Sequence, residues 1–297
     1  MRLIRSVAIA VLMLGTGEQA RALTFNFSVV SGDTLTSAQS AAFTAAASAW
    51  SATVTDNFTV TLQIGFRSLA TGVLGQTSAS LVQGSASAIR TALVADAKSA
   101  DDVAAVASLA NATGQLLVTT AQSKALGLGS SGSDGTIEFS SSFSFSTSRD
   151  GNGTIAGGTY DLIGIAEHEI GHVLGFISAV DGLPSPTLLD EFRYGSASNR
   201  SLTAGQNAYF SIDGGITDIN NFAIGGSGNA QASHWITGTG ALMDPAIAAG
   251  NTQNITALDR RAFDVIGYDL ATNVPEPATL ALLLPFVLAA VRSRRQV

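Results

Sequence analysis

The chain of 297 residues contains no cysteine, few charged side chains and only three histidines. The absence of cysteine excludes disulfide bonds. Charged residues make up 12% of the sequence and leave a formal net charge of −7, which argues against nucleic acid or an anionic membrane as a binding partner. The length is sufficient for one large domain or two modest ones with a sizeable hydrophobic core.

The scarce histidines are confined to two short segments. His168 and His172 flank Glu169 in the segment His-Glu-Ile-Gly-His, and His234 precedes a Leu-Met-Asp-Pro segment. Residues four apart lie on the same face of a helix, so two imidazoles at this spacing can bind one metal ion at about 2.0–2.1 Å. The glutamate is rotated by about 100° around the helix, which places its carboxylate beside the ion. The pattern predicts a zinc site in which Glu169 takes a proton from metal-bound water.

The sequence around this motif favours a helix. Asp161 is suitably placed to cap its N-terminus, and apolar residues follow. Gly175, three residues after His172, is placed to end the helix. Gly164 and Gly171 lower the helix propensity, so we expect packing to hold the helix together.

The segment His-Glu-Ile-Gly-His-Val-Leu-Gly-Phe resembles the start of the metzincin protease signature, H-E-x-x-H-x-x-G-x-x-H. The third histidine of that signature would fall at Ser178, whose hydroxyl is a poor zinc ligand. Leishmanolysin-like metzincins are similar, because a long insertion precedes their third histidine and a methionine turn follows it. This resemblance implies that His234 is the third zinc ligand and that Met243 lies beneath the metal.

A competing interpretation takes the third ligand from a glutamate, as in thermolysin-like enzymes. Glu191 follows the first two histidines at a spacing that resembles the thermolysin group. Gly175 and the pairing of His234 with Met243 favour the metzincin alternative. Otherwise Glu191 is expected to be a surface carboxylate or one paired with Arg193.

Both ends of the chain resemble export signals. Residues 1–22 combine basic residues, an apolar stretch and an Ala-Arg-Ala motif, which predicts a signal peptide. Residues 274–297 contain a Pro-Glu-Pro box, a short apolar run and a basic end. This tail closely resembles the PEP-CTERM signal of Gram-negative bacteria, which an exosortase recognises and cleaves. The resemblance implies an exported protein, at the cell surface or outside the cell, with transient membrane association. A simple C-terminal membrane helix is the alternative.

The segment between these ends, residues 23–273, is expected to form one catalytic domain of the α+β class. Helical patterns cover residues 36–50, residues 85–110 with a break near 98–101, the histidine motif and residues 256–265. Alternating patterns predict strands at residues 58–66, 116–120, 136–139 and 143–145. The metzincin resemblance implies an upper half, about residues 23–177, with a mixed sheet and the active-site helix. It also implies a loop-rich lower half, about residues 178–273, with the methionine turn and a final helix.

Three segments carry narrower expectations. In metzincins an edge strand above the cleft pairs with extended substrate, and residues 136–145 are the candidate here. Residues 181–232 are rich in Gly, Asn and Ser, which predicts a loop-rich insertion. Residues 149–153 carry part of a calcium-loop pattern but lack the remaining acidic ligands, which favours an ordinary turn.

Together these patterns predict an exported zinc endopeptidase that acts on protein or peptide substrates. Glu169 is expected to assist the attack of zinc-bound water on a peptide carbonyl and to pass the proton to the leaving amine. The lack of cysteine excludes a cysteine-based latency switch. Two alternatives stay open: a non-catalytic surface or matrix protein that keeps the fold and the zinc, and a thermolysin-like peptidase that uses Glu191. The presence of Glu169 argues against the first, because a purely structural zinc site does not need it.

Overall fold

The computed structural model describes residues 23–109, 113–226 and 230–271. The predicted signal peptide and the predicted sorting tail, at residues 1–22 and 274–297, lie outside the described residues. The described part mixes helices and strands, which confirms the expected α+β class. Within those three ranges, no helix is both long and apolar enough to cross a membrane.

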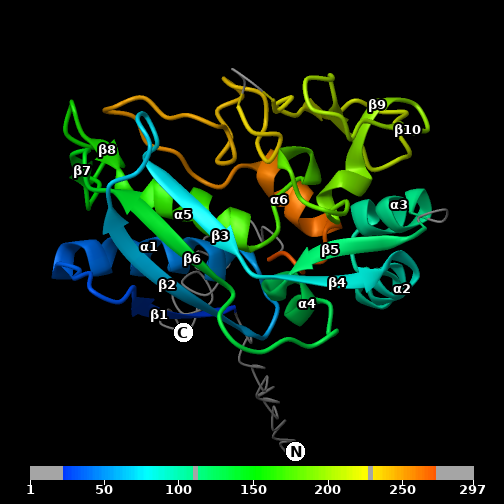
Figure 1. Ribbon diagram of the computed structural model, residues 1–297, viewed down its shortest axis with the longest axis horizontal. Coiled ribbons are helices and arrows are strands. Elements are labelled where there is room, and N and C mark those ends of the chain that lie inside the picture. The colour runs from blue at the N-terminus through cyan, green and yellow to red at the C-terminus, as the bar shows by residue number, and fades with distance from the viewer. Residues whose placement is uncertain (1–22, 110–112, 227–229, 272–297) are drawn as a thin grey trace, which may run out of the picture.

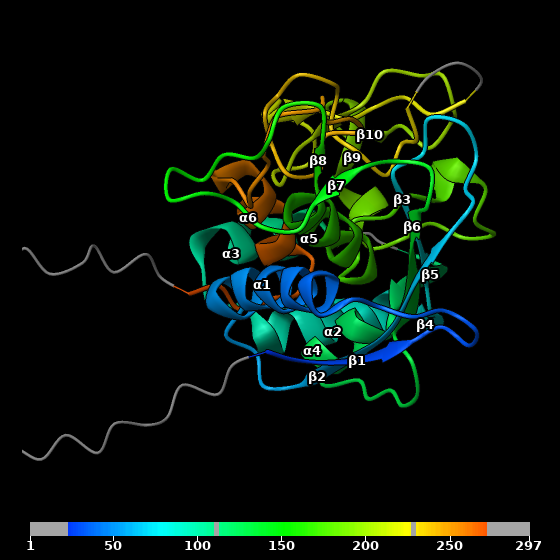
Figure 2. The same cartoon turned by 90° about the vertical axis from the view of Figure 1, so that its left-hand side faces the viewer.

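A four-stranded mixed sheet forms the body of the molecule (Figure 1). Its strands, in spatial order, are β1 (Thr24–Val29), β2 (Thr59–Arg67), β6 (Gly135–Ser140) and β3 (Gly75–Ala79). The first three run parallel, and β3 pairs antiparallel with β6. Two helices, α1 (Ser37–Thr53) and α5 (Leu162–Val173), pack against each other beside this sheet (Figure 2).

The prediction that residues 136–145 form the substrate-pairing edge strand is wrong. β6 lies inside the sheet, between β2 and β3, and pairs with both of them. The edge strand is β3, whose sequence Gly-Gln-Thr-Ser-Ala contains no large apolar side chain. Strand β3 therefore lacks the hydrophobic alternation by which strands are predicted, and strand order depends on contacts between distant segments.

Local patterns account for the elements that build the core. Alternate residues of β2 are buried, and α1 buries Phe43 and Trp50 on one side. Trp50 packs edge-on against Phe263 at 4.6 Å between ring centroids and donates its indole N–H to the backbone oxygen of Glu167. The first helix is thereby fastened to the helix that carries the histidine motif.

A second group of smaller elements lies beyond one end of the sheet (Figure 1). The strands β4 (Leu81–Ser85) and β5 (Gln115–Thr119) pair antiparallel, and α2 (Ala86–Asp96), α3 (Ala100–Ser108) and α4 (Thr120–Ala125) accompany them. The expected helical stretch from 85 to 110 is thus two helices, with the break where the sequence predicts it. Ser99 caps α3 by accepting a hydrogen bond from the backbone N–H of Asp102.

The lower half is loop-rich, as expected, but it contains a small sheet of its own. Its elements are the 3₁₀ helices Ala179–Asp181 and Leu189–Phe192 and a sheet of β9 (Arg193–Ser196), β10 (Asn199–Arg200), β11 (Tyr209–Phe210) and β12 (Asn220–Asn221). In the upper half, before the histidine helix, the short strands β7 (Phe145–Ser146) and β8 (Tyr160–Asp161) pair with each other. The final helix, α6 (Ala257–Val265), lies where the sequence predicts it and begins after its N-cap residue, Thr256. Residues 149–153 lie in a turn, in which the Asp150 carboxylate accepts hydrogen bonds from the backbone N–H groups of Asn152 and Thr154.

Candidate metal centre

Specific residues, and not helix propensity alone, fix the start and the end of the helix that carries the histidine motif. Asp161 is the N-cap residue, but its side chain makes no capping hydrogen bond and instead accepts one from Arg149 Nε at 3.0 Å. Gly164 leaves room for this pair, since a Cβ atom there would lie 2.6 Å from the Asp161 carboxylate. Gly175 ends the helix with a φ of 109°, a left-handed conformation that glycine adopts freely.

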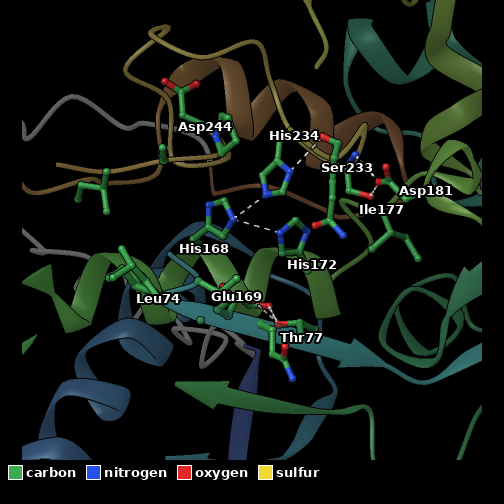
Figure 3. A pocket seen from close by; sticks show the side chains of 18 of the residues that line it. Leu74, Thr77, His168, Glu169, His172, Ile177, Asp181, Ser233, His234 and Asp244 are labelled. Carbon is green, nitrogen blue, oxygen red and sulfur yellow. Dashed lines mark hydrogen bonds between the residues drawn. The ribbon is translucent and has the colours of Figure 1, made fainter. Parts of the chain in front are cut away.

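The structure brings the three predicted histidines together at one point (Figure 3). His168 Nε2 lies 3.2 Å from His234 Nε2 and 3.1 Å from His172 Nε2. His168 and His172 come from consecutive turns of α5, whereas His234 comes from the far end of the insertion. The side chains are only 9%, 8% and 7% exposed, so the cluster is almost withdrawn from water.

The hydrogen bonds of the three Nδ1 atoms indicate the tautomer of each ring. Each Nδ1 contacts a backbone carbonyl: Leu242 for His168 at 2.7 Å, Phe176 for His172 at 2.7 Å, and Gln231 for His234 at 3.1 Å. A carbonyl oxygen can only accept, so every Nδ1 must carry a proton, and in a neutral ring the Nε2 atom then presents a lone pair. Three lone pairs directed at one another repel unless a cation lies between them.

The spacing of these nitrogens fits a metal ion. Ligands about 2.0–2.1 Å from zinc in a tetrahedral arrangement lie roughly 3.3–3.4 Å apart, close to the separations of 3.1 and 3.2 Å observed here. Backbone carbonyls that hold Nδ1–H are also the usual partners of metal-binding imidazoles. The group can therefore hold a metal ion with three nitrogen ligands.

Burial keeps the rings of His172 and His234 in the form that binds metals. It lowers the pKa of His172 well below its usual value, and the neighbouring His168 and His234 lower it further. Burial also lowers the pKa of His234 to about 3, again with a contribution from His168. Neutral imidazole is the state whose ring nitrogen can donate to a cation.

Glu169 lies beside the histidines, at the foot of the cleft. Its side chain is 5% exposed, and the Thr77 hydroxyl lies 2.7 Å from its Oε2 atom. Burial raises the pKa of Glu169, while the proximity of His168 and the hydrogen bond from Thr77 act in the opposite direction. The carboxylate is thus next to the predicted metal position but is not a member of the three-nitrogen group.

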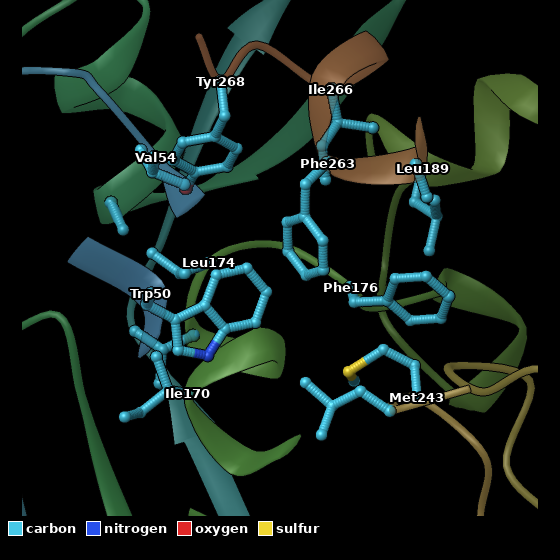
Figure 4. Close-up of a cluster of buried hydrophobic side chains, with 14 of the residues drawn as sticks. Trp50, Val54, Ile170, Leu174, Phe176, Leu189, Met243, Phe263, Ile266 and Tyr268 are labelled. Atoms are coloured by element: carbon cyan, nitrogen blue, oxygen red, sulfur yellow. The ribbon is translucent and has the colours of Figure 1, made fainter. Parts of the chain in front are cut away.

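Met243 packs directly beneath the histidine helix. A Cβ atom on Gly171 would lie 2.6 Å from the Met243 sulfur, so the glycine allows the thioether to touch the helix backbone. Met243 is fully buried together with Phe176 and Phe263 (Figure 4). The structure thus places the Met243 sulfur against the helix backbone between His168 and His172.

Hydrogen bonds to Asp181 fix the position of the chain just before the third histidine, His234. The Oδ1 atom of Asp181 accepts the backbone N–H of Ala232 at 2.7 Å, and its Oδ2 atom accepts both the N–H and the hydroxyl of Ser233. Ser178, which occupies the place of the usual third histidine, donates its N–H to the Ser233 hydroxyl at 2.9 Å. These hydrogen bonds join the residues immediately before His234 to the segment that follows α5.

A buried carboxylate, Asp259 of α6, holds the turn that contains Met243. Its two oxygens accept hydrogen bonds from the indole of Trp235 at 2.9 Å and from the backbone N–H groups of Leu242 and Met243 at 2.8 and 3.2 Å. They also accept the backbone N–H of the helix cap Thr256. Because the carbonyl of Leu242 accepts a hydrogen bond from His168, the Asp259 carboxylate also helps to hold the histidine group in place.

We expect Asp259→Ala to lower the free energy of unfolding by about 3–5 kcal/mol, because it leaves several buried N–H groups without an acceptor. Chemical denaturation followed by tryptophan fluorescence measures the change. Asp213→Ala is the matched control, since that carboxylate accepts hydrogen bonds only within its own turn, from Ser211, Ile216 and Thr217. A loss no larger for Asp259→Ala than for the control would contradict the assigned role.

The carboxylate of Glu191 is not part of the histidine group. Its Oε2 atom forms an ion pair with Arg200 Nη2 at 2.8 Å, and the histidine group contains no carboxylate. The expected partner, Arg193, is buried and donates instead to the backbone oxygens of Ala223 and Ala232. Burial raises the pKa of Glu191, and the Arg200 guanidinium lowers it.

The histidines open into a cleft of about 860 Å³. Strand β3 forms one wall, and residues 244–247, after the methionine turn, also line it. Of the residues that shape the centre, Gly75 and Thr77 of β3, Asp181 and Asp259 were not predicted. Only Asp259 had a local signal, as the fourth residue of a Thr-x-x-Asp capping box.

No protein-family model and no curated protein matches the chain.

Proposed function

We propose that the protein is a zinc-dependent endopeptidase with a leishmanolysin-like metzincin fold. The observation that carries the proposal is the convergence of three imidazoles on one point, beside a buried glutamate, at the base of an open cleft. Three protein ligands with a fourth position open to the cleft are typical of catalytic zinc, whereas structural zinc sites are closed by four protein ligands.

The histidines and the glutamate have separate roles in this proposal. His168, His172 and His234 would hold the zinc ion, which when bound polarises a carbonyl and lowers the pKa of water. Glu169 accepts a proton from the attacking water and donates it to the leaving amine. Its burial supports this role, since a carboxylate with a raised pKa is suited to carrying a proton in both directions.

Strand β3 is the proposed binding element for the substrate backbone. It is the edge strand of the sheet and lines the cleft. An extended peptide can add to such an edge through main-chain hydrogen bonds. A protein or peptide bound along β3 would pass the histidine group, which supports an endopeptidase over a binding protein without catalytic activity.

The predicted processing of both ends belongs to the same proposal. Removal of residues 1–22 by a signal peptidase and of the tail by an exosortase would place residues 23–273 at the surface of a Gram-negative bacterium or outside it. Membrane association through the tail would then be transient.

We expect the purified protein to contain one zinc ion per chain and to hydrolyse casein. Treatment with a chelator such as 1,10-phenanthroline should abolish hydrolysis, because water activation requires the ion, and added zinc should restore it. Elemental analysis and release of labelled casein peptides measure the two quantities. Absence of stoichiometric metal, or hydrolysis that persists after the metal has been removed, would refute the proposal.

A further inference from the structure

Two residues of the edge strand β3 face the glutamate of the metal centre. The Thr77 hydroxyl lies 2.7 Å from Glu169 Oε2 and 3.0 Å from the Glu169 backbone oxygen. Gly75 lies on the same face of the strand, because residues two apart in a strand point to the same side. Figure 3 shows Thr77 and Glu169 joined below the three histidines.

Gly75 provides the space for the other carboxylate oxygen. A Cβ atom at this position would lie 2.8 Å from Glu169 Oε1, and the three nearest atoms to it all belong to the Glu169 side chain. The φ angle of Gly75 is not in the left-handed region, so alanine is compatible with its backbone conformation. The absence of a side chain at Gly75 therefore matters for Glu169 and not for the strand itself.

We infer that β3 positions the general base: Thr77 donates a hydrogen bond to one oxygen of Glu169, and Gly75 leaves room for the other. Both are positioning residues that act through Glu169. The inference rests on the proposed function and extends it, because the strand proposed to bind the substrate backbone also orients the base. One element then sets the distance between the substrate peptide bond and the carboxylate that moves the proton.

This arrangement has a kinetic consequence. A buried carboxylate without Thr77 can rotate away from the metal position, so a smaller share of enzyme–substrate complexes is ready to react. The backbone of β3, to which the substrate is proposed to bind, is unchanged by such a substitution. The loss is therefore expected in kcat and not in KM.

The first test compares Thr77→Val with Thr77→Ser in the full chain, using a fluorogenic peptide. Valine should lower kcat about 10–100-fold, the effect typical of losing one hydrogen bond to a charged group, with KM and zinc content unchanged. Serine keeps the hydroxyl and should restore most of the activity. The control is Thr136→Val in β6, since Thr136 pairs with Ser78 and so lies on the opposite face of the sheet from Thr77.

The second test is Gly75→Ala. The three atoms nearest to the new methyl group all belong to the Glu169 side chain and none to the backbone, so the variant should fold with a thermal midpoint close to that of the wild type. Its kcat should nevertheless fall by about tenfold or more, because the carboxylate is displaced. Gly84→Ala in β4 is the control, since a Cβ atom there would meet only Ile89, at 3.3 Å.

The outcomes separate this inference from the function on which it rests. An inactive wild-type protein overturns the proposed function and the inference with it. An active wild type in which Thr77→Val and Gly75→Ala keep their kcat overturns the inference alone. A fall in kcat that Thr77→Ser does not restore, or one accompanied by loss of zinc, shows that Thr77 has only a structural role and also overturns it.

Discussion

Glu169→Gln is expected to reduce peptide hydrolysis by about 10²–10⁴-fold and to leave the zinc content unchanged. The amide has nearly the shape of the carboxylate but cannot accept the proton of the attacking water. The metal stays because its three nitrogen ligands do not include residue 169. Elemental analysis and steady-state kinetics on the same preparation measure both effects.

Glu167→Gln is the matched control for this prediction. Glu167 is a buried glutamate of the same helix, 3% exposed, and it does not line the cleft. Burial raises the pKa of Glu167 to about 8, so this substitution replaces a buried carboxyl group of α5 by an amide of the same size. A general effect of losing a carboxyl group from α5 would therefore appear in both variants. Retained hydrolysis in Glu169→Gln, or loss of its zinc, would contradict the assigned division of labour.

His234→Ala is expected to lower zinc affinity by more than about 100-fold. Loss of a partner that merely orients a ligand already costs about 10–100-fold, and removal of the ligand itself must cost more. The two remaining imidazoles, four residues apart on α5, cannot enclose the ion alone. Competition with a coloured chelator of known affinity gives the dissociation constants.

Glu191→Ala serves as the counterpart, because Glu191 is the only competing third ligand that the sequence suggests. Its carboxylate pairs with Arg200, so the variant should lose that ion pair and keep its zinc. The reverse result, in which Glu191→Ala releases the metal and His234→Ala does not, would replace the metzincin assignment with a thermolysin-like one.

Several elements could be predicted because their signals are local. The core side of α1, the alternation in β2, the break between α2 and α3 and the cap of α6 each lie within a few residues of the element they specify. The spacing of His168 and His172 is equally local, since a helix converts a separation of four residues into a shared face. Gly175 belongs to the same class, because the left-handed conformation that ends α5 favours glycine.

The edge strand could not be predicted for a physical reason. β3 consists of small and polar residues, so no hydrophobic pattern marks it, and its place at the edge depends on pairing with β6, some sixty residues further along the chain. The prediction placed there residues 136–145, which do show hydrophobic alternation. Alternation indicates that one face of a strand is buried but not which neighbours the strand has.

By itself, the sequence predicted the pair of helical histidines, the glutamate between them and a metal site built on them. Resemblance added His234 and Met243, but the sequence alone left Glu191 open as a competitor. Only the tertiary structure decided between them, because Asp181 and Ser233 return the insertion to α5 through hydrogen bonds between segments far apart in the chain. The same holds for the contact of Thr77 with Glu169 and for the contact of Asp259 with the methionine turn, because no periodic pattern in the sequence indicates either contact. Such contacts form only when folding closes long loops, and local propensity carries no information about which loops close.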